Sequence, residues 1–263
     1  MSKGIKIAVS GKGGVGKTTL SAALAKLYSR AGYTVIAVDA DPDANLATAL
    51  GINADQAAAI TPISAMKDLI AERTGAQSGS MGGFFSINPK VDDIPENLYT
   101  DANGIRLMVL GTVDNAGAGC ICPESALLRR LTQHLIVERD EAVILDMEAG
   151  IEHFGRATAQ AVDMLVVVIE PGRRSLQTAY KVAELGGALG IPHIGLVLNK
   201  LADDSQLESL RGDLPDLEFL GTIGHHQDMI DIDLAEKAAW TSEPLMAEVE
   251  TIHHAIQELL VKE

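Results

Sequence analysis

Glycine, lysine and threonine residues near the N-terminus are spaced as a phosphate-binding loop requires. The sequence there reads Gly11, Lys12, Gly13, Gly14, Val15, Gly16, Lys17 and Thr18, followed by Thr19. Glycines let successive backbone N–H groups turn inward around phosphate oxygens, while a lysine and a hydroxyl reach the phosphates and Mg²⁺. An apolar run precedes the motif and a helical pattern follows it, as a P-loop needs. The sequence therefore predicts a nucleotide site in which Lys17 contacts phosphate and Thr18 contacts the metal.

Carboxylates follow two of the predicted strands. Asp146 comes directly after an apolar run, and a buried strand that ends in a carboxylate is typical of a Walker B site. Such a charge near Thr18 would hold Mg²⁺ through its water shell. Asp39, Asp41 and Asp43 follow another strand. Three carboxylates within five residues are also compatible with a plain acidic loop that caps the next helix.

The two cysteines, Cys120 and Cys122, are separated by one residue. Pro123 favours a helix start directly after them, and a thiol beside a helix N-terminus is stabilised as the thiolate, which binds soft metals. Two thiolates supply two of the four ligands of a tetrahedral site, whereas a two-fold dimer that joined both cysteine pairs would supply all four. The pair therefore predicts a Ni²⁺ or Zn²⁺ site between subunits, with two inert thiols or a local disulfide as alternatives.

The elements that must position these residues alternate along the chain. Short runs rich in Val, Ile and Leu indicate strands at 5–9, 35–38, 107–110, 143–145, 164–169 and 194–198. Helical periodicity lies between or after them at 18–30, 63–73, 126–138, 176–189 and 245–260. This alternation predicts an α/β fold, a doubly wound and mostly parallel sheet flanked by helices. We expect one domain over 1–263, with an irregular loop insertion at about 74–104.

Charge and hydropathy disfavour several classes of function. The 36 acidic and 21 basic residues give a net charge of -15, which repels nucleic acid and anionic membranes. No apolar stretch approaches the roughly 18 to 20 residues of a spanning helix, and the first apolar run is too short for a signal peptide. We therefore expect a cytoplasmic protein with no nucleic-acid partner and no membrane partner, in a compartment where a disulfide framework is not expected.

The segment GKGGVGKTT carries an extra lysine, Lys12, and resembles the deviant Walker A motif of the MinD and nitrogenase iron protein superfamily. The resemblance implies that Lys12 reaches the partner's nucleotide across a homodimer, as an arginine finger does. It also implies that Asp41, in the segment DADPDANL, positions the attacking water, so that Lys12, Lys17 and Asp41 are the catalytic residues of an ATP hydrolase. Asn199 and Lys200 resemble the turn that reads adenine in this superfamily.

A narrower resemblance extends over nearly the whole chain. The segments ADPDANL, GCICPE and DMEAGIEHFGR, together with the deviant Walker A motif, look like those of CooC-type ATPases, which mature carbon monoxide dehydrogenase. The resemblance implies a homodimer that depends on nucleotide and metal, binds ATP or ADP with Mg²⁺, and holds Ni²⁺ or Zn²⁺ on Cys120 and Cys122. Carbon monoxide dehydrogenase is then the expected client. The segment 147–156 takes the place of a second switch, with Gly150 as its pivot.

Two other functions stay open as alternatives. An ATP-dependent iron–sulfur reductase like the nitrogenase iron protein takes a cluster ligand just after the Walker B aspartate, where this chain has Ala149, although two Cys-x-Cys pairs could hold a cluster by themselves. A MinD- or ParA-like positioning ATPase needs a basic membrane helix or a basic DNA-binding surface, and the acidic chain offers neither. The histidines His225, His226, His253 and His254 are expected to be surface residues.

Overall fold

The computed structural model describes residues 4–76, 86, 89–91, 98–111, 123–134, 140–148 and 162–261. Within these ranges, eight strands form one sheet in the order β3-β4-β2-β5-β1-β6-β7-β8. The parallel strands are β1 (Ile5–Gly11), β2 (Thr34–Ala40), β4 (Ile105–Val109), β5 (Glu141–Glu148), β6 (Met164–Ile169), β7 (His193–Leu201) and β8 (Glu218–Gly224). The short strand β3 (Thr100–Ala102) pairs antiparallel with β4 at one edge.

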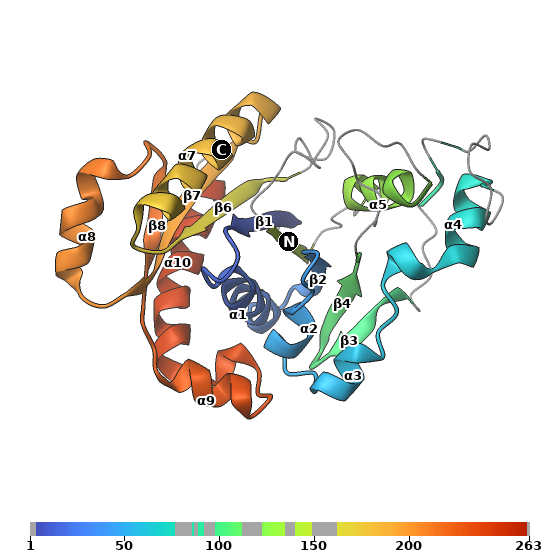
Figure 1. Ribbon diagram of the computed structural model, residues 1–263, viewed down its shortest axis with the longest axis horizontal. Coiled ribbons are helices and arrows are strands. Elements are labelled where there is room, and N and C mark those ends of the chain that lie inside the picture. The colour runs from blue at the N-terminus through green and yellow to red at the C-terminus, as the bar shows by residue number, and fades with distance from the viewer. Residues whose placement is uncertain are drawn as a thin grey trace.

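Helices cover both faces of this sheet (Figure 1). On one face lie α1 (Lys17–Arg30) and α10 (Glu243–Val261), and on the other lie α4 (Lys67–Thr74), α5 (Pro123–His134) and α7 (Arg173–Leu189). Successive strand residues point to opposite faces, so Ile7 and Val9 of β1 join the first core while Ala8 joins the second. The doubly wound, mostly parallel α/β fold predicted from the sequence is confirmed.

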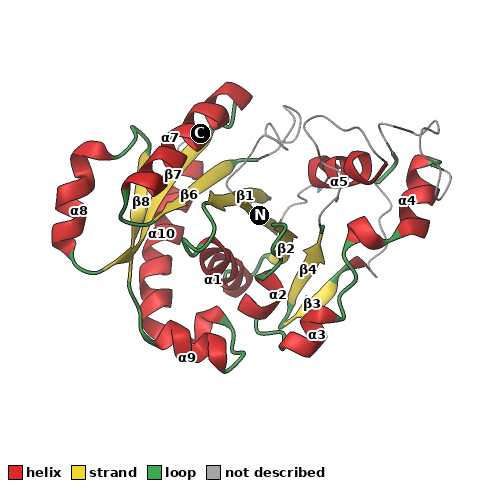
Figure 2. Cartoon of the chain, viewed as in Figure 1, coloured by secondary structure: helices red, strands yellow, loops and turns green. Residues whose placement is uncertain are grey.

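Shorter helices occupy the connections (Figure 2). They are α2 (Leu46–Ala49), α3 (Ala54–Ala58), α8 (Asp204–Leu210) and α9 (Asp228–Leu234), with 3₁₀ turns at Ile63–Ala65, Arg211–Asp213 and Ala239–Thr241. These helices have one or two turns each, too few to give a clear period in the sequence. Among the described helices, none is both long and apolar enough to cross a membrane.

β1 lies in the interior of the sheet, between β5 and β6. Every residue of β6 is buried, because an interior parallel strand is covered by helices on both sides. In parallel strands the carboxyl ends meet at the same edge of the sheet. The residues after β1, β2, β5 and β7 are therefore brought together at the edge where the P-loop lies.

One sequence expectation is wrong at its C-terminal end. The stretch 74–104, expected to be irregular, contains strand β3. Asn103 and Gly104 both have positive φ, 55° and 82°, and they form the tight turn between β3 and β4. An Asn-Gly pair is a strong hairpin signal, so the antiparallel pairing with β4 prevails over the weak strand preference of Thr-Asp-Ala.

Candidate nucleotide-binding site

The P-loop connects the end of β1 to the start of α1. Gly14 and Gly16 have φ of 81° and 91°, a conformation that glycine adopts without strain. A side chain at Gly11 would meet the carbonyl oxygen of Val168 at 2.5 Å, so glycine is also needed where β1 passes β6. Val15 is fully buried and anchors the loop in the core. The sequence thus determines the loop through backbone freedom at two glycines, a close approach at a third, and one apolar anchor.

Three side-chain contacts join the start of α1 to the acidic residues at the ends of β2 and β5. The Nζ atom of Lys17 lies 2.6 Å from Oδ2 of Asp41, and both side chains are almost fully buried. Thr18 donates its hydroxyl hydrogen bond to Oδ2 of Asp146, over 2.6 Å. Ser21 donates to the other oxygen, Oδ1, of Asp146 over 3.2 Å. The residues predicted to bind phosphate, metal and water are therefore neighbours.

Asp39 holds the loop that carries Asp41. Its Oδ1 accepts a hydrogen bond from the backbone N–H of Asp41 over 3.2 Å, and its Oδ2 accepts one from Leu46 over 2.9 Å. The backbone N–H of Asp43 donates to Oδ1 of Asp41 over 2.9 Å. Asp39 thus fixes both ends of the loop from a fully buried position. It does more than cap a helix, and its direct contact is with the backbone of the proposed catalytic residue.

Burial raises the pKa values of two of these carboxyl groups. For Asp39 burial is the largest cause, the charges of Asp146 and Asp41 add to it, and the pKa reaches about 7. Burial also raises the pKa of Asp146, to about 6, against the hydrogen bonds from Thr18 and Ser21 and the charge of Lys17. The site concentrates negative charge that the positive lysine offsets only in part.

On the opposite side of the P-loop, Asn199 and Lys200 lie near the carboxyl end of β7. Asn199 donates from Nδ2 to the carbonyl oxygen of Val15 over 2.7 Å, and Lys200 donates from Nζ to the carbonyl oxygen of Gly14. Both residues predicted to read adenine therefore contact the backbone of the P-loop. Their role in base recognition stays a prediction.

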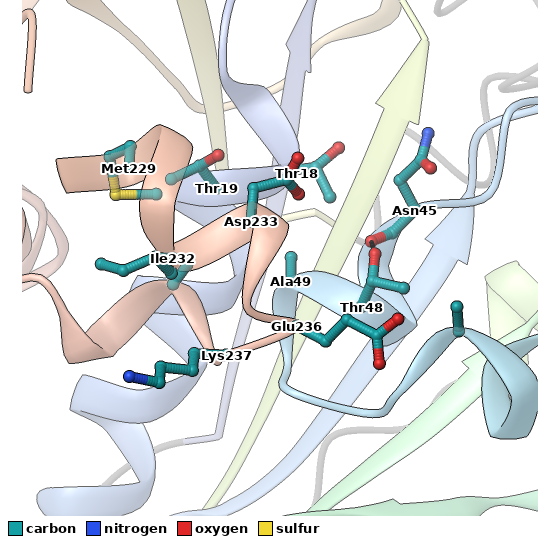
Figure 3. A pocket seen from close by; sticks show the side chains of 12 residues that line it. Thr18, Thr19, Asn45, Thr48, Ala49, Met229, Ile232, Asp233, Glu236 and Lys237 are labelled. Atoms are coloured by element: carbon teal, nitrogen blue, oxygen red, sulfur yellow. Dashed lines mark hydrogen bonds between the residues drawn. The ribbon is translucent and has the colours of Figure 1, made fainter. Parts of the chain in front are cut away.

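A cavity of about 320 Å³ opens beside the P-loop. Figure 3 shows Thr18 and Thr19 facing Asp233 of α9, with Asn45 and Thr48 across from them. Thr19, predicted to belong to the nucleotide site, therefore lines a space adjoining the loop. The volume lies at the lower end of the range of small-molecule sites, and the lining combines hydroxyl, carboxylate and apolar groups.

Some of the remaining predicted residues lie in the described part of the chain and others do not. Lys12, Gly13 and Gly14 are exposed at the tip of the P-loop. Cys120, Cys122 and the second-switch residues from 149 onward lie outside the described residues. Within the described ranges, no group of three or more His, Cys, Asp or Glu side chains is arranged to hold a metal ion.

Two of the four histidines expected at the surface are partly buried there. His226 lies 2.6 Å from Oε2 of Glu248 on α10, and its side chain is only 17% exposed. His253 packs edge-on against Tyr28, with ring centroids 4.5 Å apart, and burial lowers its pKa. His225 and His254 are exposed, as expected. Partners on other elements, which the sequence alone does not reveal, account for the difference.

Neither Ser21 nor the loop-holding role of Asp39 was predicted from the sequence. Ser21 follows Lys17 by four residues and donates to its carbonyl oxygen, so helical spacing could have placed it on the same face of α1. No comparable signal existed for Asp39, because its partners depend on how the loop folds back. Its position at the end of a buried strand was the available hint.

The donor set around Thr18 and Asp146 fits Mg²⁺. A hydroxyl and a carboxylate oxygen are hard ligands, and this ion usually takes one or two protein ligands together with water and phosphate oxygens. The two oxygens lie 2.6 Å apart at the start of α1, whose N-terminal end favours anions. The arrangement can therefore hold a magnesium-bound polyphosphate.

Comparison with known proteins defines the class first. Residues 6–237 match the model of the CbiA family, described as the CobQ/CobB/MinD/ParA nucleotide binding domain. The chain belongs to this family of nucleotide-binding proteins.

A more specific relationship follows from individual relatives. The chain is 52% identical over 219 residues to the carbon monoxide dehydrogenase accessory protein CooC of Rhodospirillum rubrum, covering 83% of each protein. It is 43% identical over 257 residues to an uncharacterised ATP-binding protein of Methanocaldococcus jannaschii, covering 97% of this chain and 98% of that protein. The resemblance to CooC-type proteins predicted from the sequence is confirmed.

Solved structures support the fold. The septum site-determining protein MinD of Pyrococcus horikoshii, complexed with Mg-ADP, superimposes with a TM-score of 0.67 at 19% identity, covering 97% of this chain and 96% of that one. A putative plasmid partition protein of Borrelia burgdorferi, bound to AMPPNP, gives 0.70 at 17% identity, with 97% and 99% coverage. At these identities the likeness concerns the architecture alone.

Proposed function

We propose that this chain is a homodimeric, Mg²⁺-dependent ATPase that holds Ni²⁺ or Zn²⁺ on Cys120 and Cys122 from two subunits and supports nickel insertion into carbon monoxide dehydrogenase. Nucleotide binding and hydrolysis are supported by two contacts next to the P-loop, that of Lys17 with Asp41 and that of Thr18 with Asp146. The client is inferred from the CooC relative, whose name specifies carbon monoxide dehydrogenase.

In the proposed reaction, Lys17 turns from Asp41 to the phosphates of ATP. Asp41 is then free to orient the attacking water and to accept its proton. Lys12, exposed at the loop tip, is delivered by the second subunit to phosphate oxygens on which negative charge grows. Thr18 and Asp146 would hold Mg²⁺, which would supply further neutralisation of phosphate charge. Hydrolysis is thereby coupled to closure of the dimer.

The cavity beside the P-loop would take the nucleoside. Asp233 and Glu236 line it together with Thr19, and carboxylates accept hydrogen bonds from ribose hydroxyls. Met229 and Ile232 offer apolar contact to a base. ATP would then lie between α1 and α9, with its phosphates at the P-loop.

The hydrolysis part is tested with Asp41→Asn and Lys12→Ala in a steady-state phosphate-release assay. Each should lower kcat by about 100-fold or more, because one removes the group that orients water and the other removes a cation from the transition state. Asp43→Asn is the matched control for Asp41, since Asp43 is exposed next to it. Lys12→Arg keeps the charge and should retain part of the rate. Unchanged turnover in Asp41→Asn and Lys12→Ala would rule out this scheme.

The metal part is tested on anaerobically purified protein titrated with Ni²⁺ or Zn²⁺, with and without ATP, while analytical ultracentrifugation follows the mass. We expect about one ion per dimer, and the loss of both the ion and the metal-driven dimer in Cys120→Ser/Cys122→Ser. A variant that keeps both would exclude the intersubunit site. An iron–sulfur chromophore would instead favour the reductase alternative.

A further inference from the structure

Asn199 is placed as a support for the P-loop. Its side chain is almost completely buried at the end of β7, and both ends of its amide have backbone partners. Nδ2 donates to the carbonyl oxygen of Val15 over 2.7 Å, across 184 residues of sequence. Oδ1 accepts from the backbone N–H of Lys200, also over 2.7 Å. One side chain therefore fixes its own turn and a peptide unit of the loop.

Lys200 adds a second contact to the preceding peptide unit. Its backbone adopts a φ of 58°, which is uncommon for a residue with a side chain and frequent at functional sites. In this conformation Nζ donates to the carbonyl oxygen of Gly14 and lies 3.5 Å from Oε2 of Glu170, the residue directly after β6. Two consecutive carbonyl groups of the P-loop thus accept hydrogen bonds from consecutive residues of β7.

These contacts set the direction of the loop's N–H groups. A trans peptide unit is planar, so its N–H points opposite to its carbonyl oxygen. With the carbonyl of Val15 directed at Asn199, the N–H of Gly16 must point to the other side of the loop. The N–H of Val15, in the unit pinned by Lys200, donates to the carbonyl oxygen of Lys12 over 3.3 Å and closes the loop's turn. Inward N–H groups are what a P-loop offers to phosphate.

Gly16 gives independent support for this arrangement. A Cβ atom at Gly16 would lie 2.1 Å from Nδ2 of Asn199, far inside van der Waals contact. Glycine at this place in the motif is therefore needed for the approach of Asn199, in addition to its φ of 91°. The loop and the end of β7 are matched to each other.

We propose that Asn199 and Lys200 are positioning residues that hold the P-loop in its phosphate-binding shape, so that they serve any polyphosphate regardless of its base. This inference rests on the proposed nucleotide binding. It assigns to Asn199 a role besides adenine recognition, because each end of the amide retains one further donor or acceptor position. Support of the loop and base recognition alone make opposite predictions for a ligand that has no base.

The test is calorimetric binding of Mg-ATP, Mg-GTP and inorganic tripolyphosphate to the full chain. Asn199→Ala should weaken all three by a similar factor, about 10-fold, because a buried carbonyl of the loop loses its donor. Weaker binding of tripolyphosphate supports the inference whether or not the ratio of ATP to GTP affinity also changes. If Asn199 acts only by reading the base, the variant instead loses ATP affinity while tripolyphosphate binding is unchanged, and the inference is wrong.

Matched variants separate these effects on ligand affinity from a general loss of folding stability. Asn103→Ala removes a similar hydrogen bond, from Nδ2 to the carbonyl oxygen of Leu50, in the β3–β4 turn and should leave all three affinities unchanged. Lys200 is exposed enough that Lys200→Met should fold normally, and this variant should bind all three ligands about 3-fold more weakly. Lys181→Met, on the surface of α7, is its control and should leave the three affinities unchanged. Wild-type protein that binds none of the ligands would refute the proposed function and this inference together. Binding by wild type with no loss in either β7 variant would refute the inference alone.

Discussion

The two sides of the P-loop differ in chemistry. On one side, the buried residues Asp41 and Asp146, which follow β2 and lie in β5, contact the start of α1, and Asp39 holds the backbone of Asp41. On the other side, β7 directs Asn199 and Lys200 at the loop's carbonyl groups. We call these the acidic flank and the amide flank. The acidic flank contains the groups proposed for the reaction, whereas the amide flank acts on the shape of the loop.

The difference shows how stability and reactivity are divided at this edge of the sheet. Burial of the carboxyl groups raises the pKa of Asp39 to about 7 and that of Asp146 to about 6, so ionising them in the folded state opposes folding. The hydrogen bond from Asn199 involves a neutral amide and has no such opposition. The contribution of the acidic flank to folding stability should therefore change with pH, and the contribution of the amide flank should not.

The largest effect is expected for Lys17→Met. Removing one partner of a buried ion pair leaves Asp41 uncompensated beside Asp146, and we expect the free energy of unfolding at pH 8 to fall by about 3 kcal/mol. The loss should be smaller at pH 5.5, where Asp146 can be protonated. Urea denaturation at both pH values measures it. Lys12→Met, at an exposed site on the same loop, should change stability by less than about 0.5 kcal/mol. If Lys17→Met lost the same unfolding free energy at both pH values, the stability of the acidic flank would not depend on pH as proposed.

Asp39→Asn tests the pH dependence directly. Because the folded-state pKa of Asp39 is raised to about 7, the folded protein retains a proton that the unfolded chain releases from about pH 4 upward. Its contribution to stability is therefore fully present below about pH 4 and declines as pH rises to about 7. The difference in unfolding free energy, wild type minus variant, should decline by about 1.4 kcal/mol for each pH unit across this window. Asp43→Asn, whose carboxylate is exposed, should show no such trend.

Asn199→Ala should have a smaller effect that is independent of pH. Loss of the hydrogen bond to Val15 leaves a buried carbonyl without its donor and should reduce stability by about 1 to 2 kcal/mol. We expect the same loss at pH 5.5 and pH 8, measured by urea denaturation. A loss that varied between these pH values would mean that the amide flank is coupled to the carboxylates, and the contrast between the flanks would not hold.

Lys200→Met should have the smallest effect on stability, within about 0.5 kcal/mol. The Nζ atom lies 3.5 Å from the Glu170 carboxylate, and both side chains are more than 40% exposed, so water and salt screen the pair. Thermal unfolding at low and high NaCl concentrations would measure this. A loss above about 1 kcal/mol would show that the contact with Gly14 bears more of the loop's stability than its exposure suggests.

Much of the fold was readable from the sequence because interior parallel strands are continuous apolar runs. All six predicted strands are present. β3 and β8 were not predicted, for different reasons. β3 is a three-residue edge strand without an apolar run. β8 is an edge strand interrupted by Gly221, which has a φ of 152°. Its register against β7 is also irregular. Edge strands carry a weaker pattern because only part of each is covered.

For the site, local motifs were informative and long-range partners were not. The P-loop, Asp41 and Asp146 could be proposed from short segments, and the structure brings them together. The contact of Asn199 with Val15 joins residues 184 positions apart, and no local spacing encodes it. The resemblance gave Asn199 a role in base recognition, whereas its atoms in the structure are engaged with backbone.

The position of β1 has a consequence for synthesis of the protein. Its two neighbours in the sheet, β5 and β6, come more than 130 residues later in the chain. The nascent N-terminal segment therefore leaves the ribosome with both hydrogen-bonding edges of β1 unpaired, and the loop's support on β7 emerges later still. A chain arrested before residue 199 contains the complete glycine motif but lacks the scaffold that shapes it. Phosphate binding by the loop is thus expected only after β7 has been made, although the glycine motif precedes β7 in the chain.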